Sequence, residues 1–477
     1  MSWQWEHIVL YIVVPILFIG TVLYGLFFAE ERKSTDKKYR VRFKLKNGRF
    51  KIDNIRRGTS IIGSAGSGKT ESVIYNFLQH FSQNGFCGVI HDYKDFELTE
   101  IAYPLFKEKN IKFYTIAFGQ IHYRVNPIAP KYLPNEESVN EVSRVLMENL
   151  LEQNLSESSG SNKFFSDAVE GLLSGMIWKM RTAYPDFCTL PHIIALFQSL
   201  STNKLVAFLK SDLTSQSMAS AFINSIESEK QTAGVKSTLA NAFKKVSSQR
   251  LFYVLSKDEV PLDINQPEHP AVVSLVNHPK YDTAYSPVIA MIMHTIIKQM
   301  SIRGRDSSFL LMEEAPTLKL PNMHRIPATL RSYDICTIYV MQDKIQNDLL
   351  YGEKASKAIL SNLSYQFFGK VNDPDTAKYY ERFFEIIKTP TKSVSKSSGL
   401  SYESRITKGE REVSKRRADV FFRLKQGEFI AFADGKDKKV RFKRPVIHRA
   451  LPPQMELSTF DLEANYRKIY AEITIIA

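Results

Sequence analysis

The stretch GSAGSGKT at residues 63–70 has the residue types and spacing of a phosphate-binding loop. It fits the pattern G-x4-G-K-[S/T], in which glycines let backbone N–H groups turn toward phosphate oxygens. In this pattern Lys69 adds positive charge at the β- and γ-phosphates, and Thr70 offers a hydroxyl to Mg²⁺. The predicted nucleotide-binding residues are Gly63, Ser64, Ala65, Gly66, Ser67, Gly68, Lys69, Thr70 and Glu71. The stretch therefore predicts a site for a nucleoside triphosphate, at the positive end of a helix that begins at Lys69.

Such a loop needs an acidic element on another strand, to hold the hydrated metal and to activate water. The run FLLMEEAP at residues 309–316 supplies it, because its four apolar residues are followed by two acids. We assign Glu313 to Mg²⁺ and Glu314 to the polarisation of the attacking water. The usual first acid is Asp, so Glu313 either reaches the metal differently or slows hydrolysis.

Polar residues at other strand ends extend this site. The strand ICTIYVM at residues 335–341 is followed by Gln342, which we predict to sense the γ-phosphate. Arg331 lies eleven residues before Gln342, and we predict that it reaches a neighbouring subunit's nucleotide as an arginine finger. The segment HDYKD brings Asp92 and Lys94 to the same edge. For each of these residues taken alone, an ordinary polar residue at a strand end is the alternative interpretation.

Strand-like and helix-like runs alternate over most of the chain, which predicts a parallel sheet. Between about residues 137 and 247, apolar residues recur at spacings of three and four, which indicates helices alone. The expected fold class is α/β: a RecA-like P-loop NTPase domain with an inserted all-α domain and one N-terminal transmembrane helix.

The same patterns give expected domain boundaries. These are a membrane anchor at 1–31, a basic linker at 32–57 with a short strand pair, a first nucleotide-binding part at 58–132, an all-α domain at 133–250, a second nucleotide-binding part at 251–455, and a C-terminal tail at 456–477. Within the second part, the Ser- and Lys-rich segment at about 389–417 is expected to be a mobile basic loop, and antiparallel strands with a Gly turn follow it.

The chain has 477 residues and a formal net charge of +14. Its composition, 44% hydrophobic and 24% charged, is that of a folded protein and excludes global disorder. The positive excess lies at residues 32–46 and again at 388–449, where 18 Lys and Arg residues face 7 Asp and Glu. Such excess suits a polyanion or an anionic membrane face, and a merely solvated basic surface is the alternative.

Residues 8–29 form an apolar run of 22 residues without a charge, which is long enough to cross a bilayer as a helix. The preceding residues contain no Lys or Arg and no cleavage site follows, so a secretory signal is excluded. The basic residues after Ala29 mark the cytoplasmic side. We expect a single-pass protein of the bacterial cytoplasmic membrane with its catalytic domain in the cytoplasm; a buried core helix is the alternative.

Several segments match one known family in order. They are GSAGSGKT, IHDYKDFELTEIAY, FCTLPHIIALF, LFYVLSKDEVPLDINQP, FLLMEEAPTL, LRSYDICTIYVMQDKIQNDLLYG and NDPDTAKYYERFF. Together with the apolar N-terminus, they make the chain resemble the type IV coupling proteins of bacterial conjugation, the TraG/TraD class. Within it, the chain is most similar to the mobilisation and conjugal transfer proteins of Bacteroides-type elements.

The resemblance implies a homo-hexameric ATPase at the cytoplasmic membrane that uses ATP and Mg²⁺. It also implies partners: single-stranded DNA, the relaxase or relaxosome, and the proteins of a type IV secretion channel. Many relatives have two membrane helices where this sequence has one, and the first acid of the pair is Glu rather than Asp.

Two other functions fit parts of the sequence. A duplex DNA translocase of the FtsK/HerA kind is also a membrane-tethered motor, although the all-helical insert argues against it. A docking receptor that binds ATP without hydrolysing it is the second, and Glu313 is the residue that favours it.

Overall fold

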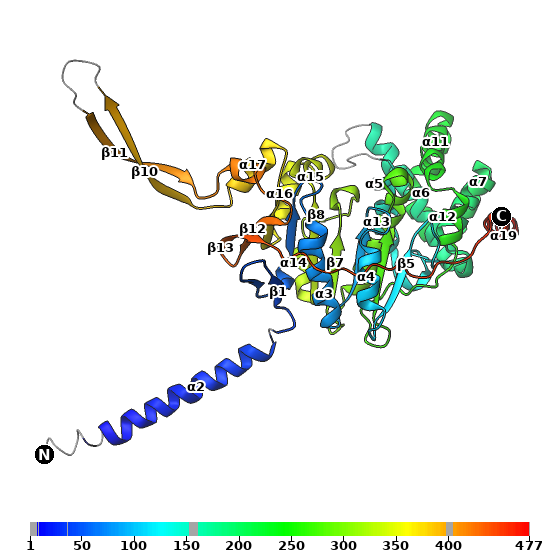
Figure 1. The fold of residues 1–477 in the computed structure, drawn as a ribbon. Coiled ribbons are helices and arrows are strands. Elements are labelled where there is room, and N and C mark those ends of the chain that lie inside the picture. Colours follow the sequence, from blue (N-terminus) through cyan, green and yellow to red (C-terminus); the bar gives the residue numbers. More distant parts are fainter. Residues whose placement is uncertain (1–6, 8, 36, 152–160, 397–403, 477) are drawn as a thin grey trace.

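The computed structural model describes residues 7, 9–35, 37–151, 161–396 and 404–476. At its centre is a nine-stranded sheet in the order β13-β12-β9-β3-β8-β7-β4-β6-β5 (Figure 1). Neighbouring strands from β9 to β5 are parallel, whereas β12 and β13 are antiparallel additions at one edge. The strands are β3 (Thr59–Ile62), β4 (Cys87–Asp92), β5 (Lys112–Ile116), β6 (Ala271–Val276), β7 (Ser308–Met312), β8 (Ile335–Met341), β9 (Tyr365–Phe368), β12 (Glu428–Ala433) and β13 (Lys436–Arg441). The predicted parallel sheet is confirmed.

Helices cover both faces of this sheet, which explains why its strands read as continuous apolar runs. The covering helices include α3 (Tyr75–Gln83), α4 (Thr99–Phe106) and α13 (Asp282–Met300). Successive strand residues point to opposite faces: Ile61 and Leu311 pack in the core that contains α3 and α4. Their neighbours Ile62 and Leu310 pack in the core that contains α13. The alternation holds both layers of helices against one rigid sheet.

Between β5 and β6 the chain is helical, as predicted for the insert. These helices are α5 (Glu136–Leu150), α6 (Ser161–Ala183), α7 (Leu190–Ser199), α8 (Thr202–Lys210), α9 (Leu213–Met218), α10 (Ser220–Asn224), α11 (Glu229–Lys245) and α12 (Gln249–Val254). Their starts follow N-capping chemistry: the Asn135 side chain accepts a hydrogen bond from the Ser138 backbone N–H, and Thr189, Ser201, Asp212 and Ser248 cap later helices. The exact edges of an all-α domain stay a prediction.

Shorter elements surround the sheet. The strand pair β1 (Val41–Lys44) and β2 (Arg49–Ile52) lies in the linker, where the sequence predicted one. The remaining helices near the sheet are α14 (Ile326–Leu330), α15 (Lys344–Tyr351), α16 (Glu353–Ser361), α17 (Pro374–Glu381) and α18 (Ala418–Phe422). Single helical turns of 3₁₀ or π type are η1 (Val9–Val13), η2 (Ile55–Arg57), η3 (Thr70–Ile74), η4 (Pro130–Tyr132), η5 (Pro185–Phe187), η6 (Ser225–Glu227), η7 (Pro279–Tyr281), η8 (Ala315–Thr317) and η9 (Arg331–Tyr333).

The segment predicted as a mobile basic loop at 389–417 is instead mostly a β-hairpin. Strands β10 (Ile386–Lys396) and β11 (Ser404–Ser414) pair antiparallel, with Ile386 opposite Ser414. The hairpin projects from the body of the molecule (Figure 1). The β-branched residues Ile, Val and Thr recur along both strands, and this β-forming signal was hidden by the abundance of Ser and Lys. Residues 397–403 of the predicted loop lie outside the described residues.

The predicted C-terminal tail forms the helix α19 (Thr459–Ile476). It lies beside α7 and α12 at the end of the molecule opposite the hairpin (Figure 1). Ile469 and Ile473 are buried there, and His192 Nε2 lies 3.0 Å from Glu472 Oε2. The C-terminus is therefore part of the helical region rather than a free extension.

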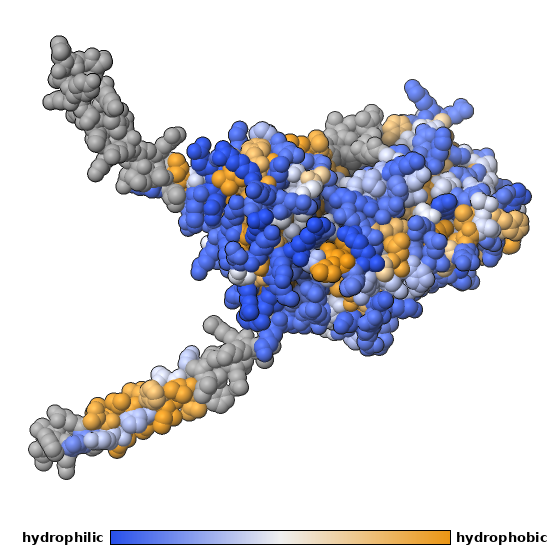
Figure 2. Space-filling view, in the orientation of Figure 1, coloured by the Kyte–Doolittle hydropathy of each residue, from blue (hydrophilic) through white to orange (hydrophobic). Residues whose placement is uncertain are grey.

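The N-terminal helix α2 (Val14–Thr35) stands away from the body (Figure 1). Apolar side chains between Val9 and Tyr24 are exposed, and Figure 2 shows them as an apolar surface. Among the helices formed by the described residues, none is long and apolar enough to cross a membrane. The predicted transmembrane helix stays a prediction.

Candidate functional site

The order of three strands builds the candidate site. Strand β8 lies between β3, which leads into the predicted phosphate-binding loop, and β7, which leads into the acidic pair. Ile62 is in register with Met341, and Met312 with Tyr339, so all three strands end at the same edge. Ligands of parallel sheets bind at the carboxyl ends of the strands. The sheet thus brings the predicted loop, Glu313, Glu314 and Gln342 to one place.

The loop from Gly63 to Lys69 needs its glycines for two reasons. Gly66 and Gly68 have φ of 74° and 89°, which side-chain-bearing residues rarely adopt. A Cβ on Gly63 would lie 2.8 Å from Ser67 Oγ, and one on Gly68 would lie 3.0 Å from the backbone nitrogen of Gly427. The loop is therefore a tight turn that requires glycine conformations at Gly66 and Gly68 and leaves little room for a side chain at Gly63 and Gly68.

Lys69 is the charge at the centre of this turn. It is 6% exposed, and its Nζ donates a hydrogen bond of 2.5 Å to the Gly63 carbonyl. Burial lowers the pKa of Lys69, and the negative charge of Glu314 partly opposes this. The hydroxyl of Ser67 is buried without a hydrogen-bond partner. A buried ammonium and an unpartnered hydroxyl in a glycine turn fit the oxygens of a nucleotide's phosphates.

The acidic pair follows β7 and is almost completely buried. Glu313 is 1% exposed and Glu314 is 2% exposed. Burial raises the pKa of Glu313 to about 8, although the nearby Lys94 ammonium lowers it. Lys94 Nζ lies 3.0 Å from Glu313 Oε1 and 3.4 Å from Glu314 Oε1. Buried carboxylates of this kind fit Mg²⁺, which prefers oxygen ligands.

Glu314 and Gln342, from neighbouring strands, are in direct contact. Gln342 Nε2 donates a hydrogen bond of 3.1 Å to Glu314 Oε1. Glu314 has φ of 44°, in the left-handed region that non-glycine residues seldom occupy. Such strain is found at sites where the surrounding structure fixes a functional side chain. The structure thus joins the residue predicted to polarise water to the predicted sensor.

Three other residues predicted for the site, Arg331, Glu71 and Thr70, lie in different surroundings. Arg331 is exposed and lies at the opposite end of β8 from Gln342, about 20 Å away at ~3.3 Å per strand residue. The Glu71 carboxylate turns to Arg444, whose Nε is 3.2 Å from its Oε2, so Glu71 offers the nucleotide only its backbone. Thr70 begins the π-helical turn η3 directly after the loop. Arg331 lies outside the candidate site of this chain.

Asp92 lies at the predicted edge but serves the fold. Its Oδ2 accepts hydrogen bonds from the Leu98 and Thr99 backbone N–H groups at 3.0 and 2.7 Å, at the start of α4. Burial raises the pKa of Asp92 to about 6, and the hydrogen bonds from Thr99 lower it. A buried carboxylate with these partners anchors the loop that carries Lys94.

Sequence reasoning missed two contributors to the site. Lys94 was placed at the sheet edge, but its contact with both acids was not predicted, since it requires β4 to lie beside β7. Gly427 was not considered; its backbone N–H donates to the Ser67 carbonyl at 2.9 Å, which supports the loop from the β12 side. A Gly between Gln and Glu just before a strand was the available signal for a tight turn.

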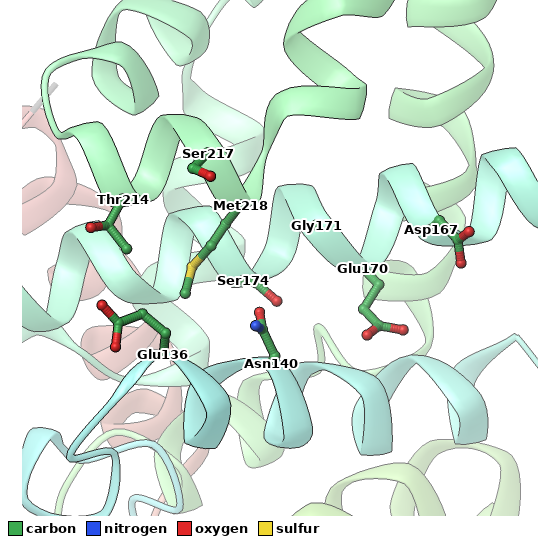
Figure 3. A pocket seen from close by; sticks show the side chains of 9 residues that line it. All are labelled: Glu136, Asn140, Asp167, Glu170, Gly171, Ser174, Thr214, Ser217 and Met218. Carbon is green, nitrogen blue, oxygen red and sulfur yellow. The ribbon is translucent and has the colours of Figure 1, made fainter.

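A second hollow lies within the helical region, between α5, α6 and α9. Glu170 and Ser174 of α6 point toward α5, from which Asn140 points back (Figure 3). Its volume is about 530 Å³. Burial raises the pKa of Glu170 to about 7, and the Arg144 charge opposes this. None of the predicted nucleotide-site residues lines this hollow.

Comparison with known proteins connects this arrangement to conjugation proteins. Residues 308–418, from β7 to α18, match the family described as the TraM recognition site of TraD and TraG. The chain also shares the fold of the bacterial conjugative coupling protein TrwBdeltaN70 in its unbound monoclinic form, with a TM-score of 0.66 and 12% identity over 86% of this chain and 90% of that one. No curated protein matches the sequence.

Two further structures of TrwB show the same fold with nucleotides. The complex with the ATP analogue ADPNP has a TM-score of 0.65 and 12% identity over 84% of this chain and 89% of that one. The complex with ADP and Mg²⁺ has a TM-score of 0.65 and 13% identity over 84% and 88%. The predicted resemblance to the TraG/TraD class is confirmed by sequence over residues 308–418. Over most of the chain, the comparison with TrwB shows a shared fold.

Proposed function

We propose that this chain is a type IV coupling protein, an ATPase that links a relaxase–DNA complex to a type IV secretion channel and drives single-stranded DNA transfer. One observation carries the proposal: Lys69, the Glu313–Glu314 pair and Gln342 converge at one sheet edge, in a chain with the fold of TrwB.

The geometry supports a division of roles in ATP hydrolysis. Lys69 binds phosphate oxygens, and backbone N–H groups of residues 63–70 surround them. Thr70 and Glu313 would hold Mg²⁺, which when bound neutralises charge on the transferred phosphoryl group. Glu314, anchored through Oε1 by Gln342, orients the attacking water. That neighbouring structures were solved with ADPNP and with ADP and Mg²⁺ supports ATP and Mg²⁺ here.

The proposal includes a homo-hexamer in which Arg331 acts on a neighbouring subunit. Its exposed position at the far end of β8 is unsuited to its own nucleotide and suited to another chain's.

The net charge of +14 favours a polyanionic partner such as DNA. We further propose that residues 8–29 anchor the chain in the cytoplasmic membrane, since their described apolar side chains are exposed and basic residues follow them.

Phosphate release by the full chain in detergent, with and without single-stranded DNA, tests this function. Turnover should rise with protein concentration and with DNA, and Lys69→Ala and Arg331→Ala should each lose it. The control is Arg303→Ala, another exposed arginine at the same end of the sheet, which should keep the wild-type rate. Arg331→Ala should still bind ADP as tightly as wild type, because Arg331 lies outside its own subunit's site.

The other functions give different results in the same assay. Stimulation by duplex DNA rather than single-stranded DNA would favour a translocase of the FtsK/HerA kind. Nucleotide binding without turnover under any condition would leave a docking receptor, and Glu313→Asp would then restore no activity. Flotation of the full chain with vesicles, compared with a chain that begins at residue 37, tests the anchor separately.

A further inference from the structure

Lys94 lies on the loop between β4 and α4 and contacts three acids. Its Nζ is 3.0 Å from Glu313 Oε1, 3.4 Å from Glu314 Oε1 and 3.8 Å from Glu97 Oε2. The side chain of Lys94 is 36% exposed, whereas those of Glu313 and Glu314 are 1% and 3% exposed. One partly exposed cation is therefore in contact with two buried carboxylates. It also contacts Glu97, whose side chain is more exposed than those of Glu313 and Glu314.

The contacts select particular oxygens. Both Lys94 Nζ and Gln342 Nε2 approach Glu314 through Oε1. On Glu313, Lys94 approaches Oε1, and the backbone N–H of Tyr93 lies 3.4 Å from Oε2. The loop from β4 and the end of β8 thus fix the acidic pair from two sides. Glu314 is held by one oxygen, so the geometry leaves Oε2 as the oxygen for water.

The loop that carries Lys94 is itself fixed in an uncommon conformation. Asp95 and Phe96 have φ of 50° and 75°, and two consecutive non-glycine residues in this region persist only where other contacts enforce them. The Asp95 N–H donates to the Asn277 carbonyl at 3.1 Å, and Asp92 accepts from the next residues of the loop. Lys94 is therefore aimed at the acids by a rigid turn, not by a flexible surface loop.

We propose that Lys94 is a positioning residue of the nucleotide site: its ammonium occupies the acidic pair in the nucleotide-free protein, orients Glu314, and competes with Mg²⁺ for Glu313. The inference rests on the proposed function for the identity of the ligand. Two buried carboxylates repel each other without a cation, and Lys94 is the cation that the described chain places within 4 Å of both. If Thr70 and Glu313 hold Mg²⁺, the Lys94 ammonium would move away from Glu313, toward Glu97 or the phosphates.

The competition predicts how Mg²⁺ and nucleotide binding depend on each other. The measured quantity is the ratio of the dissociation constant for ADP in excess EDTA to that in excess Mg²⁺. In Lys94→Met, Glu313 is free of its competitor, so this ratio should rise about tenfold, the effect of one charge-assisted hydrogen bond. Lys94→Arg should return the ratio toward wild type. Lys107→Met, which removes an exposed lysine at the end of α4, is the matched control and should change nothing.

A second variant should shift the ratio in the opposite direction, and it keeps the Lys94 ammonium. Glu97→Gln removes the acid that draws Lys94 outward, so Lys94 should hold Glu313 more firmly and the ratio should fall. Glu100→Gln removes an equal charge three residues further on, in the first turn of α4, where Glu100 pairs with Arg449, and should leave the ratio unchanged. If Lys94→Met does not fold, the Glu97→Gln result alone decides.

The outcomes separate this inference from the proposed function. If wild type binds ADP but neither Lys94→Met nor Glu97→Gln shifts the ratio, Lys94 does not compete with Mg²⁺ and the inference is wrong. If wild type binds no ADP in either condition, the proposed function fails and the inference fails with it. A ratio that rises in Lys94→Met and falls in Glu97→Gln supports both.

Discussion

The sheet edge and the helical region bury polar groups in opposite ways. At the sheet edge, charged groups are buried: Lys69, Glu313 and Glu314 are each at most 6% exposed. In the helical region, several buried polar groups are hydroxyls bonded to carbonyls, such as Ser215 Oγ to Gly175 O at 2.9 Å and Thr232 Oγ1 to Ser225 O at 2.7 Å. Buried charge opposes folding unless a partner compensates it, whereas satisfied hydroxyls do not. The first region is built for a ligand and the second for stability.

The largest expected effect is on the stability of the helical region, and it tests whether that region supports folding but not nucleotide binding. Phe243 on α11 is fully buried and packs edge-to-face on Phe197 with ring centroids 5.5 Å apart. Phe243→Ala should lower the free energy of unfolding by ~3–5 kcal/mol, because a large cavity remains. Urea denaturation measures the loss. The affinity for ADP should be unchanged, and Leu213→Ala, which truncates an exposed side chain of the same helical region, should alter neither quantity.

At the sheet edge, we expect a substitution of Lys69 to weaken nucleotide binding without lowering the stability of the protein. Lys69→Ala should weaken ADP binding by ~100-fold, since about two charge-assisted hydrogen bonds of ~1.5 kcal/mol each are lost. The melting temperature of the nucleotide-free protein should not fall, because burial of the ammonium is unfavourable, as its lowered pKa indicates. Lys370→Ala removes an exposed lysine beside the loop and serves as control. A strongly destabilised Lys69→Ala would break the comparison.

The last expected effect is on the pH dependence of stability, and it occurs in both regions. The pKa of Glu313 is raised to about 8 and that of Glu170 to about 7, both chiefly by burial. Between its unfolded and folded pKa values, each group binds more protons in the folded protein. The free energy of unfolding therefore falls as the pH rises from about 4.5 toward 8 for Glu313 or 7 for Glu170.

Denaturation at several pH values measures these slopes. Glu313→Gln and Glu170→Gln should each make the dependence shallower than in wild type, while the exposed Glu229→Gln should not. Saturating Mg²⁺ and ADP should flatten the Glu313 part alone, because the ligand compensates that carboxylate. Equal flattening of the Glu170 part would contradict the separation of the two regions.

The signals that marked residues of the candidate site in the sequence are local. Lys69 sits in a contiguous motif, and Glu313, Glu314 and Gln342 each end an apolar run, so a strand and its polar terminus could be recognised together. Strand order then brought them together without further information from the sequence. Gln342 meets Glu314 because β8 is adjacent to β7, which no property of either run specifies.

What the sequence did not predict depends on non-local packing or on a weak pattern. Lys94 contacts the acids only because β4 pairs with β7. Lys94 and Glu313 are 219 positions apart in the sequence, and no local pattern links them. The hairpin β10–β11 projects from the body, so no alternation of apolar residues marked it. The helix α19 did carry a signal, since Leu462, Ile469 and Ile473 recur at helical spacing, but the segment was interpreted as a tail.

The strand order has a consequence for the time course of synthesis. Strand β3 pairs only with β8 and β9 in the described sheet, and the first of these begins at Ile335. The ribosome needs roughly 14–55 s at ~5–20 residues per second to travel from Ile62 to Ile335. Until then GSAGSGKT is attached to a strand without a neighbour. A chain released early would carry the intact motif but no sheet to hold it, so aborted products would be unable to consume nucleotide in the cell.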